Sequence, residues 1–217
     1  MEMMPVTQMN KDRASRMLLA GFGCALIGMP TLAAADSCVS AADLEAGVRV
    51  DYNDGSAGEF RRLPDGLIEV VEAGSAAGGG DLRFLSRFGV YDVEAAALVD
   101  GAASPDQRVS YTYAGSDLRE PKSGTDPWVG EVTIAFPDGA TEAQTAAYVF
   151  GPRSQVDLGG CTYDVVPVRA TFVRANGWEG QGFSYFPTLG IATLTSKSGS
   201  GLDDVEFGMT AMRGVTP

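Results

Sequence analysis

Five short dipeptides constrain the fold of this chain more than any other feature. Asp or Asn precedes Gly at Asp54, Asp65, Asp100, Asp138 and Asn176. Such pairs tolerate the positive φ angles of a tight hairpin turn. The segments between them alternate apolar and polar residues, which is typical of strands with one buried face. The pattern therefore predicts strands joined as antiparallel hairpins.

The segments with β-type composition extend over most of the chain after residue 46. Expected strands cover residues 47–52, 67–72, 83–99 as two strands with a bend or bulge at Gly89, 108–113, 129–136, 162–174, 183–186, 191–195 and 205–212. Pro167 lies inside the longest of these and predicts an edge position or a bulge. We expect an all-β fold: an antiparallel meander of about ten strands that forms a curved sheet, a half-barrel or a barrel, with little helix.

Helix and long loops are expected in only a few places. Ser40 is a plausible N-cap for two helical turns over residues 40–46, with Asp43 three residues on. Residues 141–147 have helical propensity but directly precede a β-type segment, so helix and strand both remain open. Residues 75–80 and 120–127 are expected to be loops.

The first 35 residues have the composition of a secretory signal peptide. Lys11, Arg13 and Arg16 precede an uncharged run over residues 17–32, and Ala33–Ala35 supply a small-residue cleavage site. We therefore expect cleavage near Ala35 and a single β-rich domain over residues 36–217, located in the periplasm or secreted. No later apolar run is comparable in length, so we expect no integral membrane segment in the mature chain.

Charge argues against some classes of partner. Of the 16 basic and 28 acidic residues, three basic and two acidic ones belong to the leader, which leaves 13 basic and 26 acidic side chains. Lys122 and Lys197 are the only lysines among them. Binding to phosphate backbones requires clustered Lys and Arg, so we expect no nucleic-acid partner.

Two cysteines remain once the leader is removed, Cys38 and Cys161. In an oxidising compartment two thiols allow one connectivity, so we expect a Cys38–Cys161 disulfide.

The chain contains no histidine. This excludes Ser-His-Asp and Cys-His catalysis and histidine-based metal sites. Asp203, Asp204 and Glu206 form the tightest acidic group, but adjacent carboxylates are expected at a solvated strand start. Ser196–Lys197 and Lys122–Ser123 are expected in loops without the spacing of a Ser-Lys catalytic motif. We expect no enzyme activity, no metal and no cofactor.

Aromatic side chains are the remaining candidates for a binding site. Packing of the core explains most of them, and a lined cavity for an apolar ligand is the functional alternative. Two tryptophans beside turns are candidates for contact with a ligand or a protein partner. The candidate binding residues are Tyr111, Tyr113, Phe136, Tyr148, Phe172, Tyr185, Trp128 and Trp178.

The segment Tyr185-Phe186-Pro187-Thr188-Leu189-Gly190-Ile191 forms an aromatic-x-Pro-x-x-Gly-aliphatic turn. It resembles a turn in exported bacterial half-barrel proteins of the class similar to periplasmic lipoprotein carriers. That resemblance implies a curved antiparallel sheet that holds an acyl chain.

These observations lead to three functional hypotheses. The first is an exported, non-enzymatic periplasmic protein that binds an apolar ligand or lipid within a curved sheet. The second is a protein-interaction or envelope assembly factor that uses exposed strand edges and the loop tryptophans, with an envelope protein as partner. The third is a hydrolase without histidine that uses carboxylates from different strands.

Overall fold

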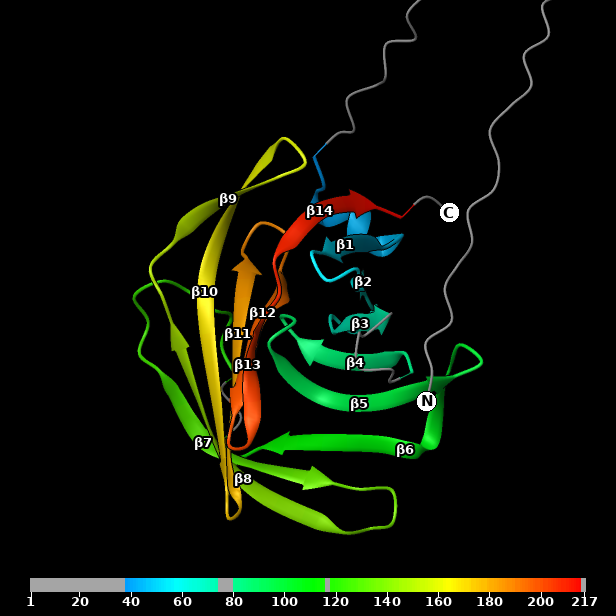
Figure 1. Cartoon of the computed structure of the whole chain (residues 1–217), viewed down its shortest axis with the longest axis vertical. Helices are drawn as coiled ribbons and strands as arrows, with labels where there is room; N and C mark the ends of the chain where they lie inside the picture. The colour runs from blue at the N-terminus through cyan, green and yellow to red at the C-terminus, as the bar shows by residue number, and fades with distance from the viewer. Residues whose placement is uncertain (1–37, 74–79, 116–117, 216–217) are drawn as a thin grey trace, which may run out of the picture. The chain divides into compact units, whose positions relative to one another are not determined.

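The structure is a computed structural model that describes residues 38–73, 80–115 and 118–215. The expected signal peptide lies outside these residues. Almost every regular element is a strand (Figure 1). The strands are β1 (Val48–Tyr52), β2 (Ala57–Arg62), β3 (Ile68–Ala73), β4 (Leu82–Arg87), β5 (Tyr91–Val99), β6 (Ala102–Tyr113), β7 (Trp128–Ala135), β8 (Thr141–Phe150), β9 (Ser154–Leu158), β10 (Cys161–Arg174), β11 (Gly177–Phe186), β12 (Ile191–Gly199), β13 (Leu202–Glu206) and β14 (Met209–Gly214).

All fourteen strands belong to one curved antiparallel sheet, which confirms the expected fold class with more strands than expected. Its order is β13-β12-β11-β10-β8-β7-β6-β5-β4-β3-β2-β1-β14, and β9 pairs with β10 beside this path. In Figure 1 the strands β1 to β6 run across the view, whereas β10 to β13 run up and down it. The curvature therefore gives the sheet a concave inner face.

The two ends of the sheet order are consecutive strands of the chain. Phe207 donates its backbone N–H to the Thr195 carbonyl over 2.9 Å, and Asn53 donates to the Gly208 carbonyl over 2.8 Å. The chain thus changes partner from β12 to β1 between Phe207 and Gly208. The expected single strand over residues 205–212 is wrong for this reason, because the segment must bend where its pairing changes sides.

The five turn dipeptides lie in hairpins as predicted. They join β1 to β2, β2 to β3, β5 to β6, β7 to β8 and β10 to β11, and each glycine has a positive φ. Gly89, where a bend or bulge is expected, lies in the turn that joins β4 to β5. Since these turns link neighbours in the sheet, local turn chemistry sets much of the topology.

Several details differ from expectation. The ambiguous segment 141–147 is strand, within β8, and residues 40–46 form a short 3₁₀ helix, η1 (Ala41–Glu45), after the expected N-cap Ser40. Ser196 and Lys197 lie in β12 rather than in a loop. The strands β2 and β9 were not predicted from the sequence.

Pro167 does not lie in an edge strand, because β10 pairs along one side with β11. On its other side β10 pairs with β9 over residues 161–165 and with β8 over residues 168–173. Pro167 lies in the gap between these two ladders, where no N–H donor is needed. Its carbonyl accepts the Gly151 N–H over 2.7 Å.

The expected disulfide between Cys38 and Cys161 is present, with Cα atoms 5.6 Å apart. It attaches the segment before η1 to the start of β10. Next to it, the buried backbone N–H of Val39 donates to the Tyr163 hydroxyl over 2.9 Å.

Buried side chains form two clusters inside the curved sheet. One contains Val48, Phe60, Ile68, Tyr163, Phe186 and Ile191, among others. The other contains Val90, Tyr91, Tyr148, Val168, Tyr185 and Ala192, among others. The tip of the β4–β5 hairpin reaches β12, since a Cβ atom on Gly89 would lie 2.5 Å from the Ala192 backbone nitrogen.

Candidate functional site

A cavity of about 220 Å³ lies on the inner face of the sheet. We call it the inner cavity. Seven strands from β4 to β12 contribute its wall. The lining residues are Phe84, Asp92, Tyr111, Tyr113, Gln144, Tyr148, Phe172, Arg174, Glu179, Gln181 and Lys197.

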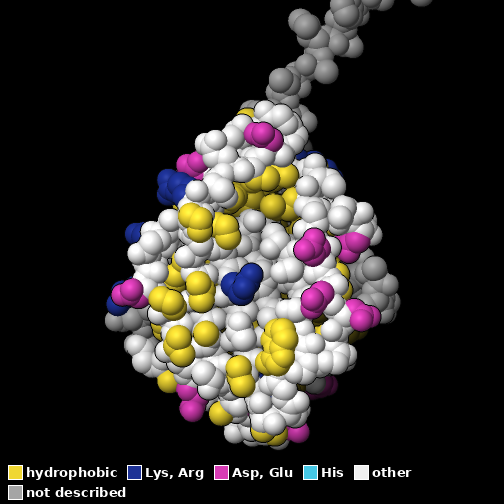
Figure 2. All heavy atoms as spheres, turned by 60° about the vertical axis from the view of Figure 1, so that its left-hand side comes forward, with side chains coloured by type: hydrophobic (Ala, Val, Ile, Leu, Met, Phe, Trp, Pro, Cys, Tyr) yellow, Lys and Arg dark blue, Asp and Glu magenta, His cyan; other side chains and the backbone are white. Residues whose placement is uncertain are grey.

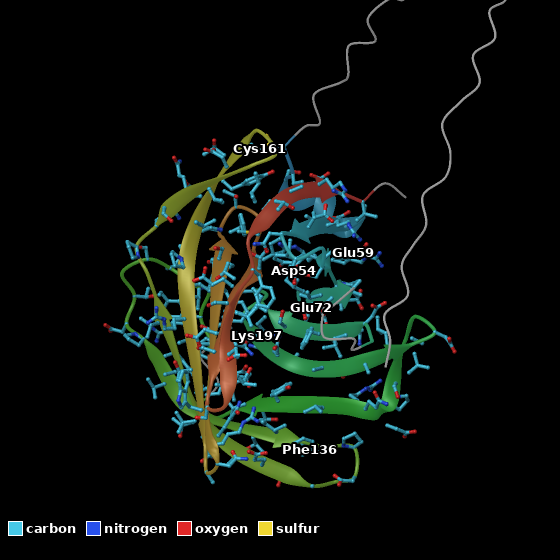
Figure 3. The ribbon with its side chains drawn as sticks, viewed as in Figure 1. Asp54, Glu59, Glu72, Phe136, Cys161 and Lys197 are labelled. Atoms are coloured by element: carbon cyan, nitrogen blue, oxygen red, sulfur yellow. A yellow bond between two sulfur atoms is a disulfide. The ribbon has the colours of Figure 1, made fainter. Side chains whose placement is uncertain are left out.

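A smaller space of about 80 Å³ adjoins the inner cavity and shares Phe84, Asp92, Gln181 and Lys197 with it. Glu72 of β3 lines this second space. Figure 3 labels Glu72 and Lys197 near the middle of the region that the sheet surrounds.

Asp92, Glu72 and Lys197 are the charged groups of this site without a partner in the described part of the chain. Among the described residues, none of the three makes a side-chain hydrogen bond or an ion pair. Asp92 follows directly on the β4–β5 turn, so the hairpin that packs against Ala192 also places this carboxyl group. Lys197 reaches the site from β12, where Gln181 of β11 is its cross-strand neighbour.

The protonation of the two carboxyl groups reflects their enclosure. Burial, followed by the charge of Glu72, raises the pKa of Asp92 to about 7, although Lys197 opposes the shift. Burial also raises the pKa of Glu72, and Lys197 again opposes the change. Desolvation disfavours the charged form of a carboxyl group, and a like charge nearby adds to that effect. Asp92 therefore exchanges a proton close to neutral pH.

An aromatic wall occupies one side of the inner cavity. The hydroxyl groups of Tyr113 and Tyr148 lie 3.2 Å apart in a hydrogen bond. The ring centroids of Tyr148 and Phe172 are 5.9 Å apart in an edge-to-face arrangement. Burial raises the pKa of Tyr111 to about 12, so its hydroxyl is neutral at physiological pH.

A polar chain lines the side nearest the β10–β11 turn. Arg174 donates from Nε to the Gln144 amide oxygen over 2.8 Å, and its guanidinium lies 3.9 Å from the Glu179 carboxylate. Gln181 donates to the same carboxylate over 2.8 Å. Because these groups satisfy one another, they form a pre-organised wall rather than free binding groups.

The structure brings most of the aromatic candidates together. Tyr111, Tyr113, Tyr148 and Phe172 line the inner cavity. Trp128 packs behind them, with its ring centroid 5.6 Å from Tyr113 and 5.8 Å from Tyr148.

Three other candidates do not line the inner cavity. Tyr185 is fully buried and donates its hydroxyl to Glu120 over 2.8 Å, which anchors the 118–127 loop. Phe136 lies at the β7–β8 turn with 37% of its surface exposed, and Trp178 is 48% exposed.

The outer face of the sheet carries scattered apolar side chains. Figure 2 shows its hydrophobic side chains mostly as separate groups among polar and backbone atoms. Exposed side chains on this side of the sheet include Val129, Val149 and Val173. Scattered apolar side chains are normal on a protein surface.

Sequence patterns did not predict Asp92, Glu72 and Lys197 as site residues. Glu72 and Asp92 lie in strands with the usual alternation of apolar and polar residues, so the pattern does not distinguish these two carboxyl groups. The available signal was Lys197, one of only two lysines after the leader and located beside a β-type segment. The convergence of all three residues depends on β3, β5 and β12, which no sequence window contains together.

The other residues considered for catalysis do not come together in the described part of the chain. Asp203, Asp204 and Glu206 are exposed on β13 as expected. Ser196 and Lys197 are successive strand residues and so point to opposite faces, which prevents a Ser-Lys pair. In the described part of the chain, no group of three or more Cys, Asp or Glu side chains could hold a metal ion. No described helix has the length and apolar character to cross a membrane.

Comparison with known proteins identifies no family. No family model matches the chain, and no curated protein matches it. Among solved structures, it is similar to the crystal structure of the hypothetical lipoprotein YmcC from Escherichia coli (K12), with 13% sequence identity and a TM-score of 0.42. The match covers 76% of this chain and 86% of that one.

Proposed function

We propose that this chain is an exported, non-enzymatic binding protein that holds a small polar molecule in the inner cavity. The observation that carries this proposal is that Asp92 and Lys197 line both the inner cavity and the smaller space next to it, where Glu72 joins them, and that none of the three has a partner among the described residues. An unpaired charge costs free energy when it is withdrawn from water. A ligand that pairs with these groups would recover part of that cost.

The polarity of the lining favours a polar ligand over an acyl chain. Charged and amide side chains make up six of the eleven lining residues: Asp92, Gln144, Arg174, Glu179, Gln181 and Lys197. A hydrocarbon chain in this space would cover these groups without forming a hydrogen bond to any of them. The apolar ligand expected from the sequence is therefore the weaker candidate.

Two observations support export. The basic, apolar and small-residue order of the first 35 residues is that of a signal peptide. The Cys38–Cys161 disulfide is typical of proteins that fold in an oxidising compartment.

Native mass spectrometry of the protein purified from periplasm tests the proposal. We expect a reproducible extra mass that belongs to a small polar molecule. Asp92→Asn should lose this mass because it removes a charge from the cavity wall. Asp106→Asn is the matched control, since Asp106 is exposed on β6.

The other outcomes distinguish the remaining hypotheses. An extra mass that matches a lipid would replace the polar ligand with the apolar one. A bare chain that gains no mass from a periplasmic extract would contradict ligand binding and favour a protein partner, with exposed Trp178 as the first residue to change. A mass that appears only as a hydrolysed product would support a carboxylate hydrolase instead.

A further inference from the structure

On the basis of the proposed function, we infer that the ligand carries an ammonium group, held between Asp92 and Glu72 and against the tyrosine wall of the inner cavity. The inference depends on the charge balance of the site, on the aromatic rings next to it and on the enclosure of Asp92. Each of these favours a cation over a neutral molecule or an anion.

The charge balance of the site favours a positively charged ligand. Two carboxyl groups, Asp92 and Glu72, face one unpaired cation, Lys197. The other cation in the wall, Arg174, is already engaged by Gln144 and lies 3.9 Å from Glu179. A second positive charge is therefore needed before both carboxylates can be ionised at low cost. A ligand ammonium group would supply it.

The aromatic wall of the inner cavity also favours a positively charged ligand. Tyr111, Tyr113, Tyr148 and Phe172 line the same cavity as Asp92. The faces of aromatic rings attract cations, and the attraction grows when water is excluded. A carboxyl group beside aromatic rings, with a second carboxyl group in the adjoining space, thus matches the two surfaces of a small ammonium compound, charge on one side and apolar contact on the other.

The titration of Asp92 predicts how ligand affinity depends on pH. The titratable and charged groups that line these two spaces together with Asp92 are Tyr52 from β1, Glu72 from β3, Tyr111 and Tyr113 from β6, Tyr148 from β8, Arg174 from β10, Glu179 from β11 and Lys197 from β12. Without a ligand, burial and the Glu72 charge raise the pKa of Asp92 to about 7. A bound cation favours the ionised form, so it would displace the proton. Binding should therefore tighten as the pH rises through this value.

An uncharged ligand predicts the opposite trend. A neutral molecule that accepts a hydrogen bond from protonated Asp92 would bind less tightly as the pH rises. An anion could pair with Lys197 but would lie close to both carboxyl groups. The direction of the pH dependence consequently separates the three ligand classes.

Fluorescence of Trp128 provides the measurement. The chain has two tryptophans, so Trp178→Phe leaves Trp128 as the single reporter, in contact with Tyr113 and Tyr148 of the cavity wall. The probes are choline, ethanolamine and lysine, with the uncharged carbon isostere of choline and acetate as comparisons. Choline serves for the pH series because its charge does not titrate.

We expect the ammonium probes to change the Trp128 emission and the isostere and acetate to leave it unchanged. Choline affinity should rise about tenfold between pH 6 and pH 8, as the fraction of ionised Asp92 increases. Asp92→Asn and Glu72→Gln should each weaken binding on the order of tenfold to a hundredfold. Glu131→Gln, which removes the same charge from the exposed face of β7, should leave it unchanged.

Two outcomes would overturn the inference in different ways. If only neutral or anionic molecules bind, or if Asp92→Asn leaves choline affinity unchanged, the ammonium ligand is wrong although a binding protein remains. If no probe binds and no mass copurifies with the protein, the proposed function fails together with it. Asp92→Asn and Glu72→Gln preserve side-chain size, and far-ultraviolet circular dichroism of each variant verifies its fold.

Discussion

At the residue scale, the site depends on groups whose surroundings change their chemistry. Asp92 is one aspartate among many in an acidic chain, and its sequence neighbours Tyr91 and Val93 do not distinguish it. Its unusual protonation comes from Glu72, Lys197 and the enclosure by other strands. The aromatic candidates were easier to predict, because large apolar side chains in alternating strands face the interior of a sheet.

Asp92→Asn should make the protein more stable at alkaline pH. The pKa of Asp92 is raised to about 7 in the folded protein from 3.8, so the folded state holds a proton between these values that the unfolded chain has lost. Stability from this group is therefore present in acid and declines as the pH rises toward 7. The asparagine variant lacks this decline, and its advantage at pH 8 should be at most about 4 kcal/mol.

Urea unfolding between pH 5 and pH 8 measures the effect. Asp106→Asn is the control, because Asp106 is exposed on β6. A stability difference between wild type and Asp92→Asn that stays constant over this range would mean that Asp92 titrates normally.

At the element scale, the β4–β5 hairpin determines how the interior is organised. Its turn at Phe88–Gly89 has a positive φ at both positions. The tip contacts β12 closely enough that Gly89 has no space for a side chain toward Ala192. A bend or bulge at Gly89 could be predicted from the sequence, but the contact of Gly89 with β12 could not, because about a hundred residues separate the two segments.

Gly89→Ala should destabilise the protein more than Gly66→Ala. Both glycines have positive φ, so both variants carry a backbone strain of about 1 kcal/mol. Only at Gly89 would the new methyl group meet backbone atoms, and this overlap should cost about 1–3 kcal/mol more. Urea denaturation midpoints of the two variants measure the difference. Equal losses would mean that the hairpin tip is not packed against β12.

The strands that the sequence analysis missed share a physical cause. β2 contains Gly58, Glu59, Arg61 and Arg62 and has little apolar alternation, yet it lies between β1 and β3. β9 is largely polar and pairs only with the first part of β10. Their hydrogen bonds come from neighbouring strands rather than from their own hydrophobic pattern, so composition underestimates them.

At the scale of the whole molecule, long-range links hold the two ends of the chain in place. The segment from β13 to β14 pairs first with β12 and then with β1, so the last strands join the start of the sheet to its end. The disulfide adds a second long-range link between residues separated by 123 positions. Both links restrict chain segments that are far apart in the sequence.

The double variant Cys38→Ser/Cys161→Ser should lose on the order of 5 kcal/mol of stability in the chain-entropy model, because a long loop is released in the unfolded state. Guanidinium unfolding of the variant and of the oxidised wild type gives the difference. Reduced wild type is the control and should behave like the variant. A loss below about 1 kcal/mol would show that unfolded-state structure or native strain cancels the entropic effect.

Local patterns in the sequence are enough to establish the all-β class, the hairpin turns, the disulfide and most of the aromatic wall. These properties depend on local φ preferences, on the alternation of side chains along a strand and on the pairing of the only two cysteines after the leader. The meeting of Glu72, Asp92 and Lys197, in contrast, follows from the folded chain alone. Their convergence requires the curvature of the sheet to bring β3, β5 and β12 around one space, and curvature is a property of all the strands together.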